Sequence, residues 1–261
     1  MKKFLSFSFL ALVLAFVYAP IILLVIYSFT DSVIIGKWDG FSLELYREIF
    51  VNERVRTMIF NTITLAVVVA VLSTIVGTLG AIGLFYSRGK LGKAVKGASN
   101  INIINAEIVI GVSLALVFSL VAFNKTYYSL VLGQMALCTP FVVLSVNPKL
   151  KQLDGNMYEA ALDLGATPPQ ALWKVVLPEI LPGILSGFMV AITLSLDDYI
   201  ITAFTKPATF DTISTYAYNA VKNQEKSDLP ALRAVSAIIF LIILVGVIVM
   251  NIKSNKKGED K

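Results

Sequence analysis

Histidine is absent from this 261-residue chain, and cysteine occurs only once, as Cys138. Without histidine the chain lacks the commonest general base and the commonest metal ligand of proteins. A single cysteine allows neither an internal disulfide nor a cysteine cluster around a metal. The composition therefore argues against a serine, cysteine or zinc hydrolase, and we expect no metal and no cofactor.

Charge is also scarce, because only 15% of the residues are charged, against roughly 25% in an ordinary soluble domain. In contrast, 57% of the residues are hydrophobic. A net charge of +5 suits a nucleic-acid-binding protein, but so apolar a chain points to a lipid bilayer instead. We therefore expect no nucleic acid partner, and we read the basic residues for membrane topology.

Long apolar stretches occur six times along the chain, and each reaches the ~17–25 residues that cross a bilayer as a helix. Because lipid cannot satisfy backbone polar groups, these stretches are predicted to be helices. The first continues well beyond the 7–15 apolar residues typical of a signal peptide, so we expect it to be retained. The sequence predicts an all-α integral membrane protein with six transmembrane helices: Phe4–Thr30, Thr57–Ser87, Gly97–Asn124, Thr126–Pro148, Ile180–Thr205 and Ala234–Ile252.

The basic residues predict the orientation of these helices. Six helices place both termini on one side, and dense basic clusters near helix ends mark the cytoplasm. We therefore expect both termini to be cytoplasmic, with outer loops at 31–56 and 206–228. Residues 1–261 are predicted to form one transmembrane domain, because the longest cytoplasmic segment, about 148–180, is too short to fold alone. The clusters are Lys2 and Lys3; Arg88, Lys90, Lys93 and Lys96; Lys149, Lys151 and Lys174; and Lys253, Lys256, Lys257 and Lys261.

The segment between the fourth and fifth stretches contains signals for two short helices. Asn156 is a candidate N-cap, with Glu159 three residues later, close to a capping box. Gly165 suits the end of that helix. Thr167 is expected to cap a second helix that begins at Pro168. The segment is therefore predicted to be a helix–turn–helix outside the bilayer.

This segment resembles the EAA loop of permease subunits from ATP-binding-cassette importers. The resemblance rests on Glu159-Ala160-Ala161, on Gly165 and on Leu177-Pro178 twelve residues further on, with Val175 where the pattern usually has isoleucine. It implies the type I importer (MetI-like) architecture, in which this loop docks on a separate ATPase. Glu159, Ala160, Ala161 and Gly165 would then couple the permease to ATP hydrolysis. The alternative is that Glu159 only caps a surface helix and Gly165 only ends it.

The chain itself is not expected to hydrolyse ATP. Gly77-Thr78-Leu79-Gly80 is not followed by the Gly-Lys-Ser/Thr pattern of a phosphate-binding loop. Those glycines fit close helix packing better. The resemblance therefore implies a permease that is not an enzyme and that works with a partner ATPase.

Three carboxylates, Glu107, Asp197 and Asp198, lie inside predicted spans. A carboxylate at the middle of a membrane costs about 2.5–3.5 kcal/mol on insertion scales, and such groups usually face a bundle interior or a water-filled path. No lysine or arginine lies deep in any predicted helix, so the acids suit a cationic substrate. Adjacent residues diverge by about 100° on a helix, so we expect at most one of the two aspartates to face a central pore and the other to meet a neighbouring helix. The alternative for each acid is that it is tied to backbone or hydroxyl groups within the bundle. Counted along straight helices, Asp197 lies ~24 Å and Glu107 ~9 Å from the inner end, which argues against one shared site.

The stretch from Ser195 to Ile201, Ser-Leu-Asp-Asp-Tyr-Ile-Ile, resembles spermidine/putrescine permeases, in particular their second, C-type membrane subunit. The resemblance runs over most of the chain. It implies a heteromeric importer in the bacterial cell membrane: two different permeases, an ATPase dimer and an extracytoplasmic polyamine-binding protein. Importers of iron or thiamine share the loop motif and are the alternative. A proton- or sodium-coupled secondary transporter would explain the acids but not the loop.

Overall fold

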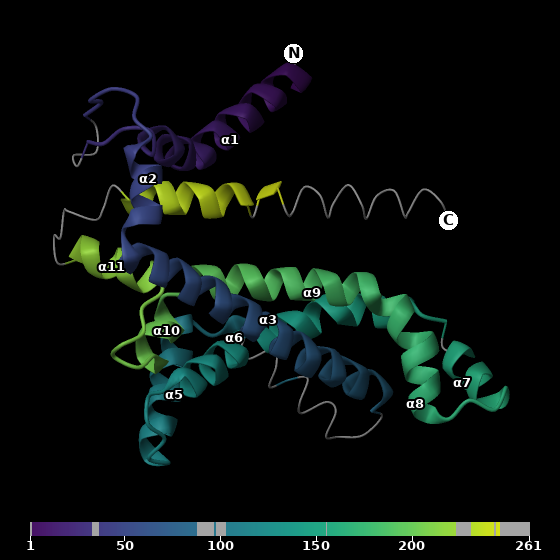
Figure 1. The fold of residues 1–261 in the computed structure, drawn as a ribbon. Helices are drawn as coiled ribbons and strands as arrows, with labels where there is room; N and C mark the ends of the chain where they lie inside the picture. The colour runs from purple at the N-terminus through teal and green to yellow at the C-terminus, as the bar shows by residue number, and fades with distance from the viewer. Residues whose placement is uncertain are drawn as a thin grey trace. The chain divides into compact units, whose positions relative to one another are not determined.

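The computed structural model describes residues 2–32, 37–87, 97, 103–154, 156–222, 231–242 and 244–245. All the regular secondary structure of this described part is helical (Figure 1). The chain divides into two compact units, one of residues 1–59 with 216–261 and one of residues 60–215. The predicted all-helical fold is therefore confirmed for the described residues.

Four helical runs of the described chain are long and apolar enough to cross a membrane. They are Phe7–Tyr27 within α1 (Lys2–Tyr27), α3 (Glu53–Tyr86), α6 (Tyr127–Gln152) and the continuous run Pro168–Asp197. These runs overlap the first, second, fourth and fifth predicted spans, although their bounds differ. α6 begins with a capping box, in which the Thr126 hydroxyl accepts from the Ser129 N–H at 3.4 Å and the Ser129 hydroxyl accepts from the Thr126 N–H at 2.8 Å.

The third predicted span is wrong as a single straight helix. The chain bends at Asn105, is extended at Ala106 and enters α5 (Glu107–Leu120) only afterwards. An asparagine side chain competes with the backbone for hydrogen bonds and so favours helix ends over helix interiors. With 14 residues, α5 is about 21 Å long, shorter than the ~30 Å hydrocarbon core. Residues 98–102 lie outside the described part.

The sixth predicted span is described only in part, as the apolar helix Ala231–Ile242. Residues 246–252 of that span lie outside the described residues. So do Arg88, Lys90, Lys93 and Lys96 and the four lysines beyond residue 252 that served for the orientation. The count of six and the cytoplasmic termini therefore stay predictions.

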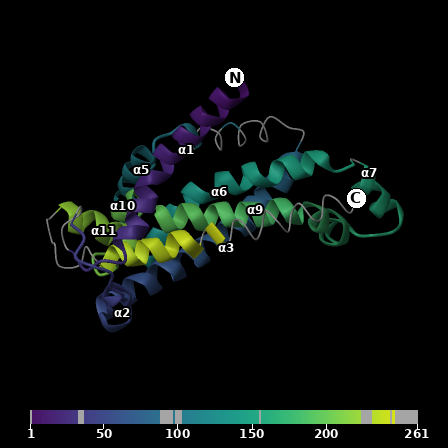
Figure 2. The same cartoon turned by 90° about the horizontal axis from the view of Figure 1, so that it is seen from above.

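The unit of residues 60–215 is organised around α6 and α9 (Leu177–Asp197), which lie side by side in both views (Figures 1 and 2). Val142 of α6 fits between two glycines: a Cβ added at Gly77 of α3 would lie 2.7 Å from its Cβ, and one at Gly187 of α9 would lie 3.1 Å from its Cγ1. Small residues of this kind let membrane helices approach closely. The core around them is apolar and includes Leu65, Val69, Leu130, Cys138, Val142, Val146, Leu150, Val176, Ile180 and Ala191.

The unit of residues 1–59 and 216–261 has an exposed apolar helix and a small aromatic cluster. Along the described part of α1, side chains such as Phe16 stay exposed, as expected for a surface that meets lipid or a partner. The short helix α2 (Glu44–Val51) follows, and the Tyr46 ring contacts Phe29 while its hydroxyl lies 2.7 Å from that of Ser28. In the same unit, Arg233 donates to the carbonyl of Ser32 at 2.9 Å.

We expect the substitution Gly77→Ala to lower the free energy of unfolding by about 1–3 kcal/mol, because its Cβ would collide with Val142. Gly83→Ala is the matched control on the same helix, because nothing lies within 4 Å of its added Cβ. It should be neutral or stabilise by about 0.5–1 kcal/mol. Thermal denaturation of the purified full-length transporter checks both variants, and equal effects would contradict the close packing of α3 on α6.

Candidate functional site

The predicted fifth span, Ile180–Thr205, is also wrong as one helix, because it breaks at Asp198. α9 ends at Asp197, Asp198 is extended with ψ 118°, and α10 runs from Ile200 to Thr205. The Asp198 carboxylate caps the new helix: Oδ1 accepts from the Ile201 N–H at 3.1 Å, and Oδ2 accepts from the Thr202 N–H at 2.8 Å. The side chain that the sequence placed in a pathway therefore starts a helix.

The last carbonyl groups of α9 also have hydrogen-bond partners. The Asp198 N–H donates to the Leu194 carbonyl at 3.1 Å, which continues the helical pattern by one bond. The hydroxyl of Ser214, in the first turn of α11 (Ile213–Lys222), donates to the Leu196 carbonyl at 3.1 Å. Side chains thus satisfy backbone groups on both sides of the break, as a helix end requires.

A buried amide on α6 completes this arrangement. Gln134 is fully buried, and its Nε2 donates to Asp198 Oδ2 at 3.2 Å and to Thr202 Oγ1 at 2.8 Å. Its Oε1 accepts from the hydroxyl of Ser195. Our reading of the sequence missed Gln134, although an amide inside the apolar stretch 126–148 was a signal that could have revealed it.

The other two acids lie near the same break. Glu107 is in the first turn of α5 and Asp197 is the last residue of α9, and both side chains are exposed. Gly111 lies one turn after Glu107 and against the first residue of α10, since an added Cβ would be 3.6 Å from Ile200 Cγ2. The three carboxylates therefore lie at neighbouring helix ends. α5 packs on α10 here, since a Cβ on Gly111 would lie 2.9 Å from the Phe204 ring.

The straight-helix count that argued against one shared site does not apply to Glu107, because the bend at Asn105 and Ala106 makes this residue the start of α5. The prediction that one aspartate meets a neighbouring helix is confirmed, because Asp198 contacts α6 through Gln134. A helix C-terminus carries a partial negative charge, so the end of α9 adds to the three carboxylates. Together they favour a cation, whereas no group of three or more His, Cys, Asp or Glu in the described chain could hold a metal ion.

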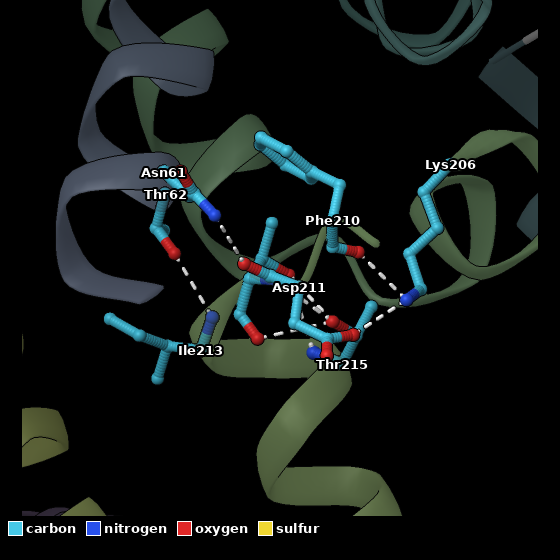
Figure 3. A network of polar contacts seen from close by, with 8 residues as sticks. Asn61, Thr62, Lys206, Phe210, Asp211, Ile213 and Thr215 are labelled. Atoms are coloured by element: carbon cyan, nitrogen blue, oxygen red, sulfur yellow. Dashed lines mark hydrogen bonds and ion pairs between the residues drawn. The ribbon is translucent and has the colours of Figure 1, made fainter. Parts of the chain in front are cut away.

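The loop after α10 is tied to α3 close to this end of the unit, as Figure 3 shows. Lys206 Nζ donates to the Phe210 carbonyl at 2.8 Å and pairs with Asp211 Oδ1 at 2.5 Å. Asn61 Nδ2 of α3 donates to the Asp211 carbonyl at 3.2 Å. The lysine therefore closes the loop on itself, and the asparagine attaches it to a long helix.

The start of α11 is fixed in the same network (Figure 3). The hydroxyl of Thr62 accepts from the Ile213 N–H at 3.0 Å. Thr212 and Thr215 exchange bonds, because each hydroxyl accepts from the other's N–H, at 3.3 and 3.0 Å. This places Ser214 where it can reach the end of α9.

The predicted helix–turn–helix is present at the opposite end of α9, as α7 (Asn156–Asp163) and α8 (Pro168–Ala171) (Figures 1 and 2). The predicted cap at Asn156 is wrong: Asn156 is already helical, and its N–H donates to Asp154 Oδ1 at 3.0 Å. An aspartate two residues earlier offers a charged acceptor, which binds the helix start more strongly than an amide.

The end of α7 follows the prediction. Gly165 has φ +89°, and its N–H donates to the Leu162 carbonyl at 2.9 Å. The Ala166 N–H donates to the Ala161 carbonyl at 3.0 Å, which completes a Schellman motif. In the second helix, Gln170 Oε1 accepts from the Thr167 N–H at 3.0 Å, so the predicted cap of α8 is confirmed.

The surface of this helix–turn–helix is exposed and partly apolar. Glu159 and Ala160 are exposed, and Ala161 is half-buried. Leu164 and Trp173 are 88% and 70% exposed, which is unusual for large apolar side chains next to charged residues. A surface with small residues flanked by large apolar ones can accept another protein at close range.

A π-helical segment, Leu172–Val176, joins α8 to α9. The Leu177 N–H donates back five residues to the Leu172 carbonyl. Pro178 follows without an N–H, so the regular i→i−4 pattern cannot be completed here. The run Pro168–Asp197 is nevertheless continuous over 30 residues, about 45 Å, and links the helix–turn–helix to the carboxylates.

The chain is similar to known proteins over most of its length. The family described as "Binding-protein-dependent transport system inner membrane component" matches residues 122–254. A curated relative from Haemophilus influenzae, "Spermidine/putrescine transport system permease protein PotC", is 33% identical over 244 residues, 94% of this chain and 95% of the relative. This chain is a member of that family.

A second relative of the permease is the "Putrescine transport system permease protein PotI" of Escherichia coli. It is 30% identical over 224 residues, which cover 83% of this chain and 80% of the relative. The permease is therefore a subunit of an ATP-binding-cassette importer and a multi-pass protein of the bacterial inner membrane.

Solved structures confirm the fold of the permease. A chain of a bacterial ABC transporter involved in the import of the acidic polysaccharide alginate superimposes with a TM-score of 0.73 at 18% identity, covering 98% of this chain and 96% of that one. The same transporter in complex with a periplasmic protein bound to an alginate pentasaccharide gives 0.71 at 19% identity, covering 98% and 95%. A MetNI methionine transporter chain gives 0.59 at 20% identity, covering 77% and 93%.

We expect Lys206→Met to loosen the loop 206–212, because it removes a half-buried ion pair and the bond to the Phe210 carbonyl. If the free energy of local opening of the loop falls by about 1 kcal/mol, its amide hydrogens exchange roughly fivefold faster. Lys37→Met is the control, because its pair with Asp39 is well exposed and should contribute almost nothing. Equal exchange in the wild type and Lys206→Met would show that the pair does not hold the loop.

Proposed function

We propose that the permease imports polyamines such as spermidine and putrescine into the cytoplasm. The observation that carries this proposal is the position of three carboxylates at neighbouring helix ends, the start of α5 and the break between α9 and α10. The relatives whose names mention spermidine and putrescine support the same cargo. Structures of this fold also include an importer of an acidic polysaccharide, so cargo depends on side chains within the fold.

Glu107, Asp197 and Asp198 form the negative part of the substrate pathway in this proposal. A polyamine loses hydration when it leaves water, and carboxylates on the pathway offset that cost. Glu107 and Asp197 are exposed and have room for an ammonium group. Asp198 is 6% exposed and contributes its charge from behind the helix break.

The helix–turn–helix is proposed as the coupling site. Glu159, Ala160, Ala161 and Gly165 lie on or beside its first helix, and the residues around them leave a small-residue surface for an ATPase. ATP-driven movement of that partner would act on the run Pro168–Asp197, whose far end holds the acids. Because this run includes a π-helical segment at its start, bending is expected there rather than in the α9 core.

The proposed assembly contains two different permease subunits, an ATPase dimer and an extracytoplasmic binding protein. In it the chain crosses the bilayer six times, both termini are cytoplasmic, and residues 1–261 form one transmembrane domain with the coupling loop at about 148–180. The binding protein is proposed to dock on the loops at 31–56 and 206–228. ATP hydrolysis takes place in the partner ATPase, and the substrate crosses at the interface of the two permeases.

We expect ATP-dependent uptake of labelled spermidine and putrescine in proteoliposomes that contain the complete complex and its binding protein. Asp197→Asn should reduce this uptake about tenfold or more, since a charged contact is worth about 1.5–3 kcal/mol. Asp197→Glu keeps the charge and should retain most of the activity. No polyamine uptake by an assembled wild-type complex would reject the substrate, and uptake driven only by a proton gradient would reject ATP coupling.

We expect Gly165→Val to uncouple transport from ATP hydrolysis, because the positive φ of this residue costs a β-branched side chain about 1–2 kcal/mol or more. Gly165→Asn is the matched control, because asparagine adopts this conformation more readily. Nothing lies within 4 Å of a Cβ built on Gly165, so the difference between the two variants reports the backbone strain and not a steric clash within the chain. ATPase activity stimulated by the loaded binding protein is the measurement, and equal losses would argue for a simple steric effect of docking.

A further inference from the structure

Gln134 lies where three helices meet, and its amide has no freedom of orientation. Its Oε1 accepts from Ser195 of α9, and its Nε2 donates to Asp198 and to Thr202 of α10. All four side chains are buried. A flipped amide would direct its oxygen at the Asp198 carboxylate, so the partners fix which end of the amide faces each helix.

The Asp198 carboxylate is held by four donors and is buried. Oδ2 accepts from the Thr202 N–H, from the Thr202 hydroxyl at 2.7 Å and from the Gln134 amide, so it has no acceptor site left. Oδ1 accepts from the Ile201 N–H, and the residue is 6% exposed. An ammonium group at Oδ2 would have to displace one of the buried donors, and burial of the side chain shields Oδ1.

The position of Asp197 depends on this arrangement. Asp197 and Asp198 are neighbours in the chain, and successive residues at a helix end point about 100° apart. Because the Asp198 side chain is held between α6 and α10, the Asp197 side chain is directed away from them and is exposed. Glu107, at the start of α5, is exposed at a neighbouring helix end.

We propose that Gln134 is a positioning residue, which locks Asp198 into the helix break so that Asp197 and Glu107 alone contact the transported cation. The locking itself is a property of the described contacts, whereas its effect on a cation rests on the proposed function. In this arrangement Asp198 acts as a structural anchor whose charge is felt by the cation without contact.

Removal of the Asp198 charge without removal of its main hydrogen bonds tests the proposal. In Asp198→Asn the amide oxygen can take the place of Oδ2, the oxygen that accepts from the Thr202 N–H, the Thr202 hydroxyl and the Gln134 amide. Asparagine is also as good an N-cap as aspartate. Gln134→Leu instead removes the amide that donates to Asp198 and Thr202. The first variant therefore removes the charge and keeps the lock, whereas the second keeps the charge and removes the lock.

We expect Asp198→Asn to keep spermidine uptake per assembled complex within about threefold of the wild type, because the lock stays in place and Asp198 does not contact the cation. Gln134→Leu should reduce uptake about tenfold and lower the melting temperature of the complex, because it leaves buried polar groups without a partner. As the matched comparison, Asp197→Asn should reduce uptake about tenfold at an unchanged melting temperature, because residue 197 is outside the network.

An Asp198→Asn complex that melts like the wild type but transports no better than Asp197→Asn would overturn the proposal, because Asp198 would then contact the cation itself. A Gln134→Leu complex that melts like the wild type would overturn it as well, because the network would not hold the break. If the wild-type complex takes up no polyamine, the proposed function fails, and the melting temperatures alone decide whether Gln134 locks Asp198.

Discussion

A helix that ends in the protein interior leaves backbone groups that water cannot satisfy, and the break between α9 and α10 is built around this constraint. The Asp198 carboxylate takes the first N–H groups of α10, and the Ser214 hydroxyl takes a carbonyl at the end of α9. Gln134 then joins the break to α6. Removing any of these side chains would leave a buried polar group without a partner, which is costly in a low-dielectric interior.

The break also creates the electrostatic character of this end of the unit. It leaves Asp197 at the C-terminal end of a 21-residue helix, where the helix dipole has the same sign as the carboxylate. The short helix α5 brings Glu107 to the same place, because Gly111 allows it to pack closely on α10. Several negative groups close together are unfavourable without a counter-charge, which the proposed cationic substrate would supply.

The two ends of the run Pro168–Asp197 differ in how firmly they are held. Around α9 the packing is close: a Cβ at Gly183 would lie 2.9 Å from Lys149 Cγ, and one at Gly187 would contact Val142. At the other end, α7 has no buried residue, and Leu164 and Trp173 are exposed. The π-helical segment thus joins a closely packed α9 to an exposed helix–turn–helix. This arrangement can transmit a displacement along the chain.

The sequence by itself determined the helical class, four of the long apolar helices, the turn at Gly165 and the cap of α8, because hydrophobic length and capping residues act locally. It also singled out Glu107, Asp197 and Asp198, because carboxylates in apolar stretches stand out. Only the tertiary structure decided that Asp198 caps a helix, that Gln134 holds it and that Glu107 lies at a helix end next to this break. Those outcomes depend on contacts between residues 64 and 68 positions apart and on a bend at Asn105, which a straight-helix count cannot represent.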